Sequence, residues 1–449
     1  MPMRILTTTM CYPTPSRPDQ GVFVQRRAAA LARRHEVHVV APQPWCPLLR
    51  RAEAKAKAGP GAGLMLTPAP PESAAGFSPG GFWSPAMPRP SAADDPSASC
   101  LPTTYPRMLS IPVLGWATDG AAFGACLQKE VRRLYRAGHP AFDLIDAHFE
   151  YPDGVGAYLA ARKLGLPVVV TLRGKLASLA RRPGRRTQIA AMLRGADGLI
   201  AVCASLARLA CQVAGRDLDV AVIPNGVDTA VFHPLDRAAA RAALGWDACG
   251  RYVLSVGHYQ RLKGFDRLIS IWPAVRRAAG DVRLVLVGSR RGERGFLPWL
   301  RRLARANGTA DAVAFRDTVG PETLNLMYNA ADLCVNASRS EGWCNAIAES
   351  LAAGTPVVAT GVGGNAEQIR SGQTGLLVPD GDSDALAAGI VAALARAWDR
   401  AAIAAGGSAR SWGQAATEAT QVFERIVGHA GKRTERAQPL TDRMPVPQG

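Results

Sequence analysis

The chain has 449 residues, 48% hydrophobic residues, nine cysteines and a formal net charge of +17. This length favours two or three domains over one core. No apolar run reaches the roughly 18 residues of a membrane span, the first residues lack signal-peptide features, and the scattered cysteines argue against a zinc site or a disulfide framework. We therefore expect a reducing, cytoplasmic setting.

The positive charge has two interpretations. It is either the arginine-rich composition of a proteome with high coding GC content, or an attraction to anionic lipid headgroups, phosphorylated ligands or nucleic acid. Basic residues cluster in segments 129–136 and 173–186. No helix-turn-helix, finger or RNA-binding signature accompanies them, so we expect no nucleic-acid partner.

The first half of the chain alternates apolar, β-branched runs with helical segments such as 22–34, 153–164 and 205–214. Continuous apolar strands that alternate with helices predict a buried parallel sheet covered on both faces. The predicted strands are 4–10, 35–42, 142–148, 167–174, 198–203 and 219–224.

Residues 51–106 interrupt this alternation with a stretch rich in Pro, Gly, Ala and Ser. Such a composition cannot bury enough apolar area to offset its ordering entropy. We expect a disordered insertion there and a second disordered segment at 430–449.

A second alternating series follows and predicts a second doubly wound domain. Its strands are 251–257, 281–288, 312–315, 332–338, 356–360 and 375–379. We expect an N-terminal domain over 1–224, a C-terminal domain over 225–410, and a helix at 411–429 that packs back toward the first domain.

The stretch SRSEGWCNAIAESLAAGTPVVAT, residues 338–360, places Glu341 after one strand and Glu349 inside the next helix, which we expect over 345–353. Ligands of open α/β sheets bind at the carboxyl ends of the strands, and a helix N-terminus suits a phosphate. Two carboxylates can accept hydrogen bonds from sugar hydroxyls. The alternative is that Glu341 is a solvated loop residue and Glu349 a surface charge.

At this stretch the chain resembles retaining glycosyltransferase family 4, whose E-x7-E motif lies in a two-domain GT-B fold with two Rossmann-like domains facing across a cleft. The resemblance extends over most of the chain outside the insertion and the tail. Further matching segments are PTPSRPDQGVFVQRRAAALARRHEVHVV, FDLIDAHFEYPDGVGAYLAARKLGLPVVVT, VIPNGVDTAVFHP, VLSVGHYQRLKGFDRLI and VGGNAEQIRSGQTGLLVPDGD.

The resemblance implies roles for individual residues. Glu349 would hold the nucleotide ribose, Glu341 the transferred sugar, and Lys263 the pyrophosphate, where a fixed ammonium stabilises the departing charge. Gly21 would let the first loop approach the donor phosphate. The backbone that cradles sugar and phosphate would be that of Gly342, Trp343, Cys344 and Asn345.

Two departures from the family pattern bear on catalysis. His258 stands where the family usually has an arginine, and Arg261 is the residue that would supply the missing charge. Arg173 stands where the family commonly has a histidine beside the reacting sugar; an arginine is no base at neutral pH. It would instead bind a phosphate or carboxylate on the donor or acceptor. The alternatives are a difference within the subfamily that preserves activity, and loss of activity. His148, at a strand end, is either structural or in contact with donor or acceptor.

The resemblance implies transfer of a sugar from a UDP- or GDP-linked donor to a glycan or lipid-linked acceptor, with retention and without metal or other cofactor. Bacterial exopolysaccharide or lipopolysaccharide assembly is the expected pathway, and an anionic inner membrane face a further expected partner. Two alternatives stay open. One is a nucleotide-sugar 2-epimerase of the same fold, and the other a non-catalytic sugar-nucleotide binder in a polysaccharide assembly complex.

Overall fold

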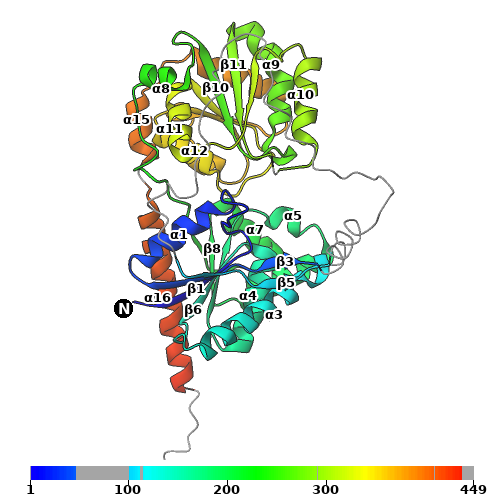
Figure 1. Cartoon of the computed structure of the whole chain (residues 1–449), viewed down its shortest axis with the longest axis vertical. Helices are drawn as coiled ribbons and strands as arrows, with labels where there is room; N and C mark the ends of the chain where they lie inside the picture. The colour runs from blue at the N-terminus through cyan, green and yellow to red at the C-terminus, as the bar shows by residue number, and fades with distance from the viewer. Residues whose placement is uncertain (1, 47–100, 112–114, 291, 409, 437–449) are drawn as a thin grey trace, which may run out of the picture. The chain divides into compact units, whose positions relative to one another are not determined.

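The structure, a computed structural model, describes residues 2–46, 101–111, 115–290, 292–408 and 410–436. Among these, residues 2–45, 101–224 and 413–436 form one compact unit, and residues 225–412 form a second. Each unit is built around its own parallel sheet (Figure 1), as the alternating sequence pattern predicts. In the part of the chain that the structure describes, no helix is both long and apolar enough to cross a bilayer.

The first unit contains a seven-stranded parallel sheet in the order β4-β2-β1-β6-β7-β8-β9. The order reverses direction at β1, which pairs with both β2 and β6. Its strands are β1 (Arg4–Thr8), β2 (Glu36–Val40), β4 (Thr103–Thr104), β6 (Leu144–His148), β7 (Val168–Leu172), β8 (Gly198–Ala201) and β9 (Val220–Val222).

Helices of the first unit connect these strands and pack on the sheet, as the contacts of α4 with β6 and β7 and of α7 with β8 and β9 show. They are α1 (Val22–Ala32), α3 (Gly115–Arg136), the π-helical turn η1 (Glu150–Gly154), α4 (Val155–Leu164), α5 (Leu176–Leu179), α6 (Pro183–Gly195) and α7 (Ala204–Ala214). The six strands predicted for this half of the chain are all present.

A two-stranded parallel sheet of β3 (Gln43–Trp45) and β5 (Arg107–Leu109) adds to this unit and is missing from the sequence prediction. Strand β4 pairs with β2 although it lies inside the expected insertion 51–106. The expected disorder therefore does not extend to residues 101–106, where two strand residues gain backbone partners on an existing sheet edge. Residues 51–100 of the expected insertion lie outside the described residues.

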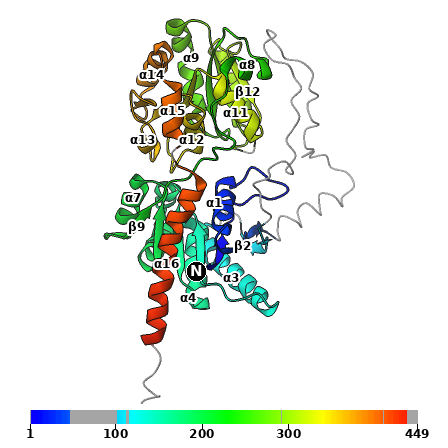
Figure 2. The same cartoon turned by 90° about the vertical axis from the view of Figure 1, so that its left-hand side faces the viewer.

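The last helix, α16 (Trp412–Arg436), belongs to the first unit from Gly413 onward. Figure 2 shows that α16 runs along the side of this unit. Thr420 of α16 hydrogen-bonds to the ring of His35 at 3.0 Å, and Ile426 packs near Gly198. The helix continues to Arg436, so the expected tail 430–449 is helical in its first part, and residues 437–449 lie outside the described residues.

The second unit contains a six-stranded parallel sheet in the order β12-β11-β10-β13-β14-β15. Two apolar cores cover its two faces, which is the doubly wound arrangement. Its strands are β10 (Arg251–Val256), β11 (Val282–Val287), β12 (Val313–Arg316), β13 (Leu333–Asn336), β14 (Val357–Thr360) and β15 (Gly375–Val378).

Three helices of the second unit begin at side-chain caps, where Asp236, Asp382 and Asp399 each accept a first-turn N–H. The elements are α8 (Arg237–Leu244), the 3-10 turn η2 (Arg261–Lys263), α9 (Phe265–Ala279), α10 (Phe296–Ala306), α11 (Pro321–Ala330), α12 (Asn345–Ala352), α13 (Asn365–Gln368), α14 (Ser383–Ala395) and α15 (Arg400–Gly407).

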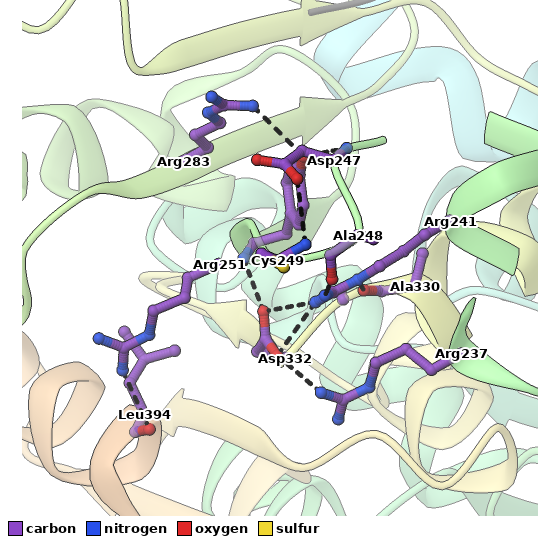
Figure 3. Close-up of polar contacts among 12 residues, drawn as sticks. Arg237, Arg241, Asp247, Ala248, Cys249, Arg251, Arg283, Ala330, Asp332 and Leu394 are labelled. Atoms are coloured by element: carbon purple, nitrogen blue, oxygen red, sulfur yellow. Dashed lines mark hydrogen bonds and ion pairs between the residues drawn. The ribbon is translucent and has the colours of Figure 1, made fainter. Parts of the chain in front are cut away.

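An ionic network around Asp332 ties the amino-terminal side of this sheet to α8 (Figure 3). The Asp332 carboxylate accepts from Arg237 at 2.8 Å, from the buried Arg241 at 3.0 Å and from the backbone N–H of Tyr252 at 2.7 Å. Arg241 also donates to the carbonyls of Ala330 and Ala248. The partners belong to α8, to the loop that follows it, to the end of α11 and to the start of β10, on the amino-terminal side of the sheet. We therefore assign this network to stability rather than to ligand binding.

Candidate functional site

The candidate site of the second unit lies where β10 and β13 end. The turn η2 follows β10, and the loop 337–344 follows β13. Gly264 lets these two segments approach: its φ is +70°, and an added Cβ would lie 2.0 Å from the carbonyl oxygen of Ala337. A side chain at residue 264 would therefore push η2 away from the end of β13.

Lys263 and Glu341 meet directly in this arrangement. The Lys263 Nζ donates to Glu341 Oε1 at 2.6 Å, and the Ser338 hydroxyl donates to the same oxygen at 2.7 Å. Lys263 is 20% exposed and Glu341 8%. Burial by itself lowers the pKa of Lys263, but the Glu341 carboxylate outweighs it and leaves the pKa above its ordinary value. The site therefore holds a fixed ammonium beside a fixed carboxylate.

Glu349, the second acidic residue of the stretch, lies on α12 and is half-buried. Its Oε2 accepts a hydrogen bond from the Tyr328 hydroxyl at 3.1 Å. Tyr328 is fully buried on α11, and burial together with the nearby Glu349 charge raises its pKa well above the ordinary value. The phenol therefore stays a donor and orients the carboxylate. The simple alternative of a solvated surface charge does not describe this residue.

The loop between the two glutamates leads into the N-terminus of α12, where the N–H groups of Ile347 and Ala348 already donate to the carbonyl of Cys344. Asn345 begins the helix as predicted, and its Oδ1 accepts from Asn225 Nδ2 at 2.9 Å. The Gly342 carbonyl accepts from the N–H of Gly364 at 3.0 Å. The indole Nε1 of Trp343 is buried and has no acceptor among the described residues.

Cys344 occupies the N-cap position of α12, and its buried thiol makes no capping hydrogen bond. Burial, together with the Glu341 charge, raises its pKa to about 12, and its sulfur accepts from Asn336 Nδ2 at 3.1 Å. Cys344 is therefore a neutral packing residue of the loop, and its expected contribution to donor binding rests on its backbone alone.

His258, at the position of the family arginine, and Arg261, expected to supply its charge, are both exposed. His258 lies just after β10. The Arg261 guanidinium stacks near Phe296 and Trp299 and lies 3.7 Å from Glu293. Its engagement with α10 gives Arg261 a surface packing role in this structure, and its expected catalytic role stays a prediction.

Arg173 and His148 of the first unit form a buried chain of contacts that sequence reasoning did not foresee. Arg173 Nη2 donates to His148 Nδ1 at 2.9 Å, and His148 Nε2 lies 3.2 Å from Asp146. Asp146 lies 3.4 Å from the buried Arg27. His148 has 0% exposure and Arg173 9%.

Burial sets the protonation of this chain. It lowers the pKa of His148 to about 4, with Asp146 opposing and Arg173 adding to the effect. It lowers the pKa of Arg173 to about 9, so this guanidinium is still charged at neutral pH. We interpret His148 and Arg173 as residues that position the ends of β6 and β7, because both ring nitrogens face protein groups.

Two buried carboxylates of η1 hold the loops that follow β1 and β7. Glu150 Oε1 accepts the N–H groups of Arg173 at 3.0 Å and Gly174 at 3.2 Å. Asp153, which resembles a helix cap in the sequence, instead accepts from the Thr9 hydroxyl at 3.0 Å and from the N–H of Met10. Burial raises the pKa of Asp153 to about 6.

Gly21 precedes α1 with a φ of +70°. An added Cβ would lie 1.9 Å from the carbonyl oxygen of Cys11. The structure thus gives this glycine a reason within the protein, namely the close return of the loop to residue 11. Its expected approach to a donor phosphate stays a prediction.

Comparison with known proteins identifies the family to which the chain belongs. The profile described as "Glycosyltransferase Family 4" matches residues 89–231, and "Glycosyl transferases group 1" matches residues 250–396. The D-inositol 3-phosphate glycosyltransferase of Acidothermus cellulolyticus is 35% identical over 325 residues, covering 68% of this chain and 71% of that protein. Its namesake from Streptomyces scabiei is 37% identical over 272 residues, covering 56% of this chain and 60% of the relative.

Solved structures agree on the fold. Sucrose-phosphate synthase from Thermosynechococcus elongatus has a TM-score of 0.63 at 22% identity, covering 97% of this chain and 98% of that one. Anabaena HepE in complex with UDP-glucose has a TM-score of 0.62 at 20% identity, covering 97% and 100%. The two parallel-sheet units therefore have a GT-B fold. The chain belongs to the group 1, family 4 glycosyltransferases.

Proposed function

We propose that this glycosyltransferase moves a sugar from a UDP- or GDP-linked donor to an acceptor hydroxyl, with retention and without a metal ion. The observation that carries the proposal is the pair of Lys263 and Glu341 at the carboxyl ends of β10 and β13, with Glu349 on the helix α12 that follows the Glu341 loop. A nucleotide sugar needs a cation to bind its diphosphate and hydrogen-bond acceptors to bind its hydroxyls. The Lys263 ammonium and the two carboxylates are groups of these kinds.

In the proposed reaction, the bond between the sugar C1 and the diphosphate oxygen breaks, and its electron pair leaves with the nucleoside diphosphate. Lys263 stabilises the charge that develops there. The acceptor oxygen forms the new bond on the same face of the sugar, and its proton passes to the departing phosphate. Glu341 and Trp343 orient the sugar, Glu349 holds the ribose, and no side chain of the protein has to act as a base.

The acceptor has two candidate classes. The first is a lipid-linked or polysaccharide precursor in cell-surface glycan synthesis, which the family resemblance suggests. The second is a small phosphorylated polyol, which the relatives named D-inositol 3-phosphate glycosyltransferase suggest at 35% and 32% identity. Competing these acceptors for one radiolabelled donor tests the choice, because transfer to one class alone names it.

A surface of the first unit favours the lipid-linked class. Trp45 and Leu109 are partners across β3 and β5 and are 37% and 50% exposed. Helix α3 packs against β5 and carries exposed Lys129, Arg132 and Arg136. Exposed apolar side chains on β3 and β5 and exposed basic ones on α3 suit an anionic bilayer, where each basic residue contributes about 1 kcal/mol.

Sedimentation with phosphatidylglycerol-containing vesicles at low salt tests this surface. We expect binding that neutral phosphatidylcholine vesicles do not give and that glutamine at residues 129, 132 and 136 weakens. Glutamine at Arg301 and Arg302, exposed on α10 of the second unit, is the matched control. Equal binding by both variants, or none by wild type, would remove the membrane from the proposal and leave the soluble acceptor.

Donor binding is tested separately, by calorimetric titration of UDP, GDP and their sugar derivatives in EDTA. We expect one nucleotide to bind to wild type and to bind at least about tenfold more weakly to Lys263→Ala, since a charged contact is lost. Unchanged binding by Lys263→Ala would contradict the assignment of the site.

A further inference from the structure

Arg339 connects the loop that carries Glu341 to the turn that carries Lys263. Its guanidinium forms a fork on Asp266, with Nη1 2.8 Å from Oδ1 and Nη2 2.7 Å from Oδ2. Nη1 also donates to the Arg261 carbonyl. The Arg339 backbone N–H donates to the Leu262 carbonyl at 2.8 Å.

These contacts lie on both sides of Lys263 in the sequence. Arg261 and Leu262 precede it in η2, and Asp266 follows it in the first turn of α9. On the other side of the connection, Arg339 is two residues before Glu341. One side chain and one backbone group thus fix the Lys263 turn on the Glu341 loop, beside the close contact of Gly264 with Ala337.

The chemistry of this connection requires an arginine. A planar guanidinium can donate two parallel hydrogen bonds to one carboxylate and still reach a carbonyl, whereas a lysine ammonium acts as a point charge. A simple surface ion pair would be worth little. The Arg339–Asp266 pair differs because Asp266 is only 12% exposed and Arg339 35%, and because two backbone carbonyls take part.

We propose that Arg339 is a positioning residue, which sets Lys263 against Glu341 and thereby determines how tightly the site holds the diphosphate of a nucleotide. The inference rests on the proposed function, since Lys263 is the group expected to contact that diphosphate. It assigns no chemistry to Arg339 itself. Loss of this positioning should weaken the binding of a nucleoside diphosphate but not that of the monophosphate, which lacks the β-phosphate.

The test measures dissociation constants for whichever of UDP and GDP binds wild type more tightly, and for the matching monophosphate. Arg339→Met and Asp266→Asn are expected to weaken diphosphate binding about tenfold, since displacement of a positioned group by about 1 Å is costly. Monophosphate binding should stay within about twofold. Arg339→Lys should fail to restore diphosphate affinity, because it cannot form the fork.

The matched control is Arg276, which lies on α9 as Asp266 does. Its guanidinium is 3.2 and 3.0 Å from the two carboxylate oxygens of Asp311, and its side chain is 30% exposed. Arg276→Met should leave both dissociation constants within about twofold of wild type. All titrations are run below the melting temperature of each variant. If Arg339→Met is not folded there, Asp266→Asn carries the test.

The outcomes separate the two proposals. Diphosphate affinity within about twofold of wild type in Arg339→Met and Asp266→Asn, or an equal loss for diphosphate and monophosphate, would overturn the positioning role. If Lys263→Ala binds the diphosphate as wild type does, or if wild type binds neither nucleotide, the proposed function itself fails.

Discussion

Lys263 donates to Glu341 at 2.6 Å, although 78 residues separate them in the chain. The same ammonium is expected to contact the donor diphosphate, and the same carboxylate is expected to contact the transferred sugar. In this structure each group is therefore the hydrogen-bond partner of the other. Substitution of either one should have different consequences for a nucleotide and for a nucleotide sugar.

Glu341→Ala should separate these roles. It frees Lys263, so we expect nucleoside diphosphate to bind within about threefold of wild type or more tightly. The sugar loses a charged acceptor, so turnover should fall by about 10²-fold or more, as when one preorganised polar group is removed from a reacting centre. Calorimetry with the diphosphate and a radiometric transfer assay measure the two effects. Parallel loss of both would contradict separate roles.

Tyr328→Phe removes the hydroxyl that orients Glu349. We expect nucleotide affinity to fall by about threefold to tenfold, because a carboxylate held in one geometry contacts the ribose better than a mobile one. Tyr259→Phe is the matched control, since the buried Tyr259 hydroxyl donates to the carbonyls of Leu286 and Arg316 instead. Both variants should lose about 1 kcal/mol of unfolding free energy; only Tyr328→Phe should lose affinity.

Asp332→Ala should destabilise the protein without a direct effect on the site. Asp332 is 21% exposed and Arg241 7%, and removal of the carboxylate leaves a buried guanidinium without its counter-charge. Loss of about 3 kcal/mol in unfolding free energy is expected, measured by urea denaturation. The nucleotide dissociation constant, measured where the variant is folded, should stay within about twofold. A marked change would place this network in the site.

Asp153 should contribute a pH dependence of stability. Its pKa in the folded chain is raised from 3.8 to about 6, so its contribution is fully present below pH 4 and is lost as the pH rises through 6. His148, whose folded pKa is lowered from 6.5 to about 4, contributes with the opposite sign. The informative quantity is therefore the difference in unfolding free energy between wild type and Asp153→Asn. This variant retains an acceptor for Thr9 and Met10.

That difference should favour wild type most at pH 4 and shrink by on the order of 2–3 kcal/mol up to pH 7, since each pKa unit corresponds to about 1.4 kcal/mol. Urea denaturation of both proteins at pH 4, 5, 6 and 7 measures it. A constant difference over this range would show that Asp153 does not titrate there.

The sequence predicts the sheets well and the contacts between distant loops poorly. The longer strands of the two large parallel sheets are visible in the sequence as continuous apolar runs. The start of α12 at Asn345 follows from the loop, the glycine and the proline around it. Strands β3, β4 and β5 have only two or three residues each. Such short pairs leave no periodic signal, and their partners come from elsewhere in the chain.

Within the site, the residue types are predictable but their partners are not. Glu341, Glu349 and Lys263 stand out by their spacing and by their resemblance to the family. Ser338 begins the matching stretch, but nothing in the sequence predicts its hydrogen bond to Glu341. Tyr328 carries no signal at all, because a tyrosine on a buried helix is an ordinary packing residue. The side chain of Arg261 contacts Phe296, Trp299 and Glu293, which lie more than 30 residues away in the sequence. Which of several possible partners a surface arginine contacts depends on the folded structure and cannot be predicted from the sequence.

The central claim is that Glu349, Glu341 and Lys263 form a nucleotide-sugar site that needs no metal. A thermal-shift panel of UDP-, GDP-, ADP- and dTDP-sugars in EDTA, on wild type and on Glu349→Ala, tests it most directly, because a ligand that binds the native state raises the melting temperature. The account predicts a selective shift for one nucleotide class with wild type and its loss in Glu349→Ala. No shift with any donor on folded wild-type protein, or an equal shift in the variant, would contradict it.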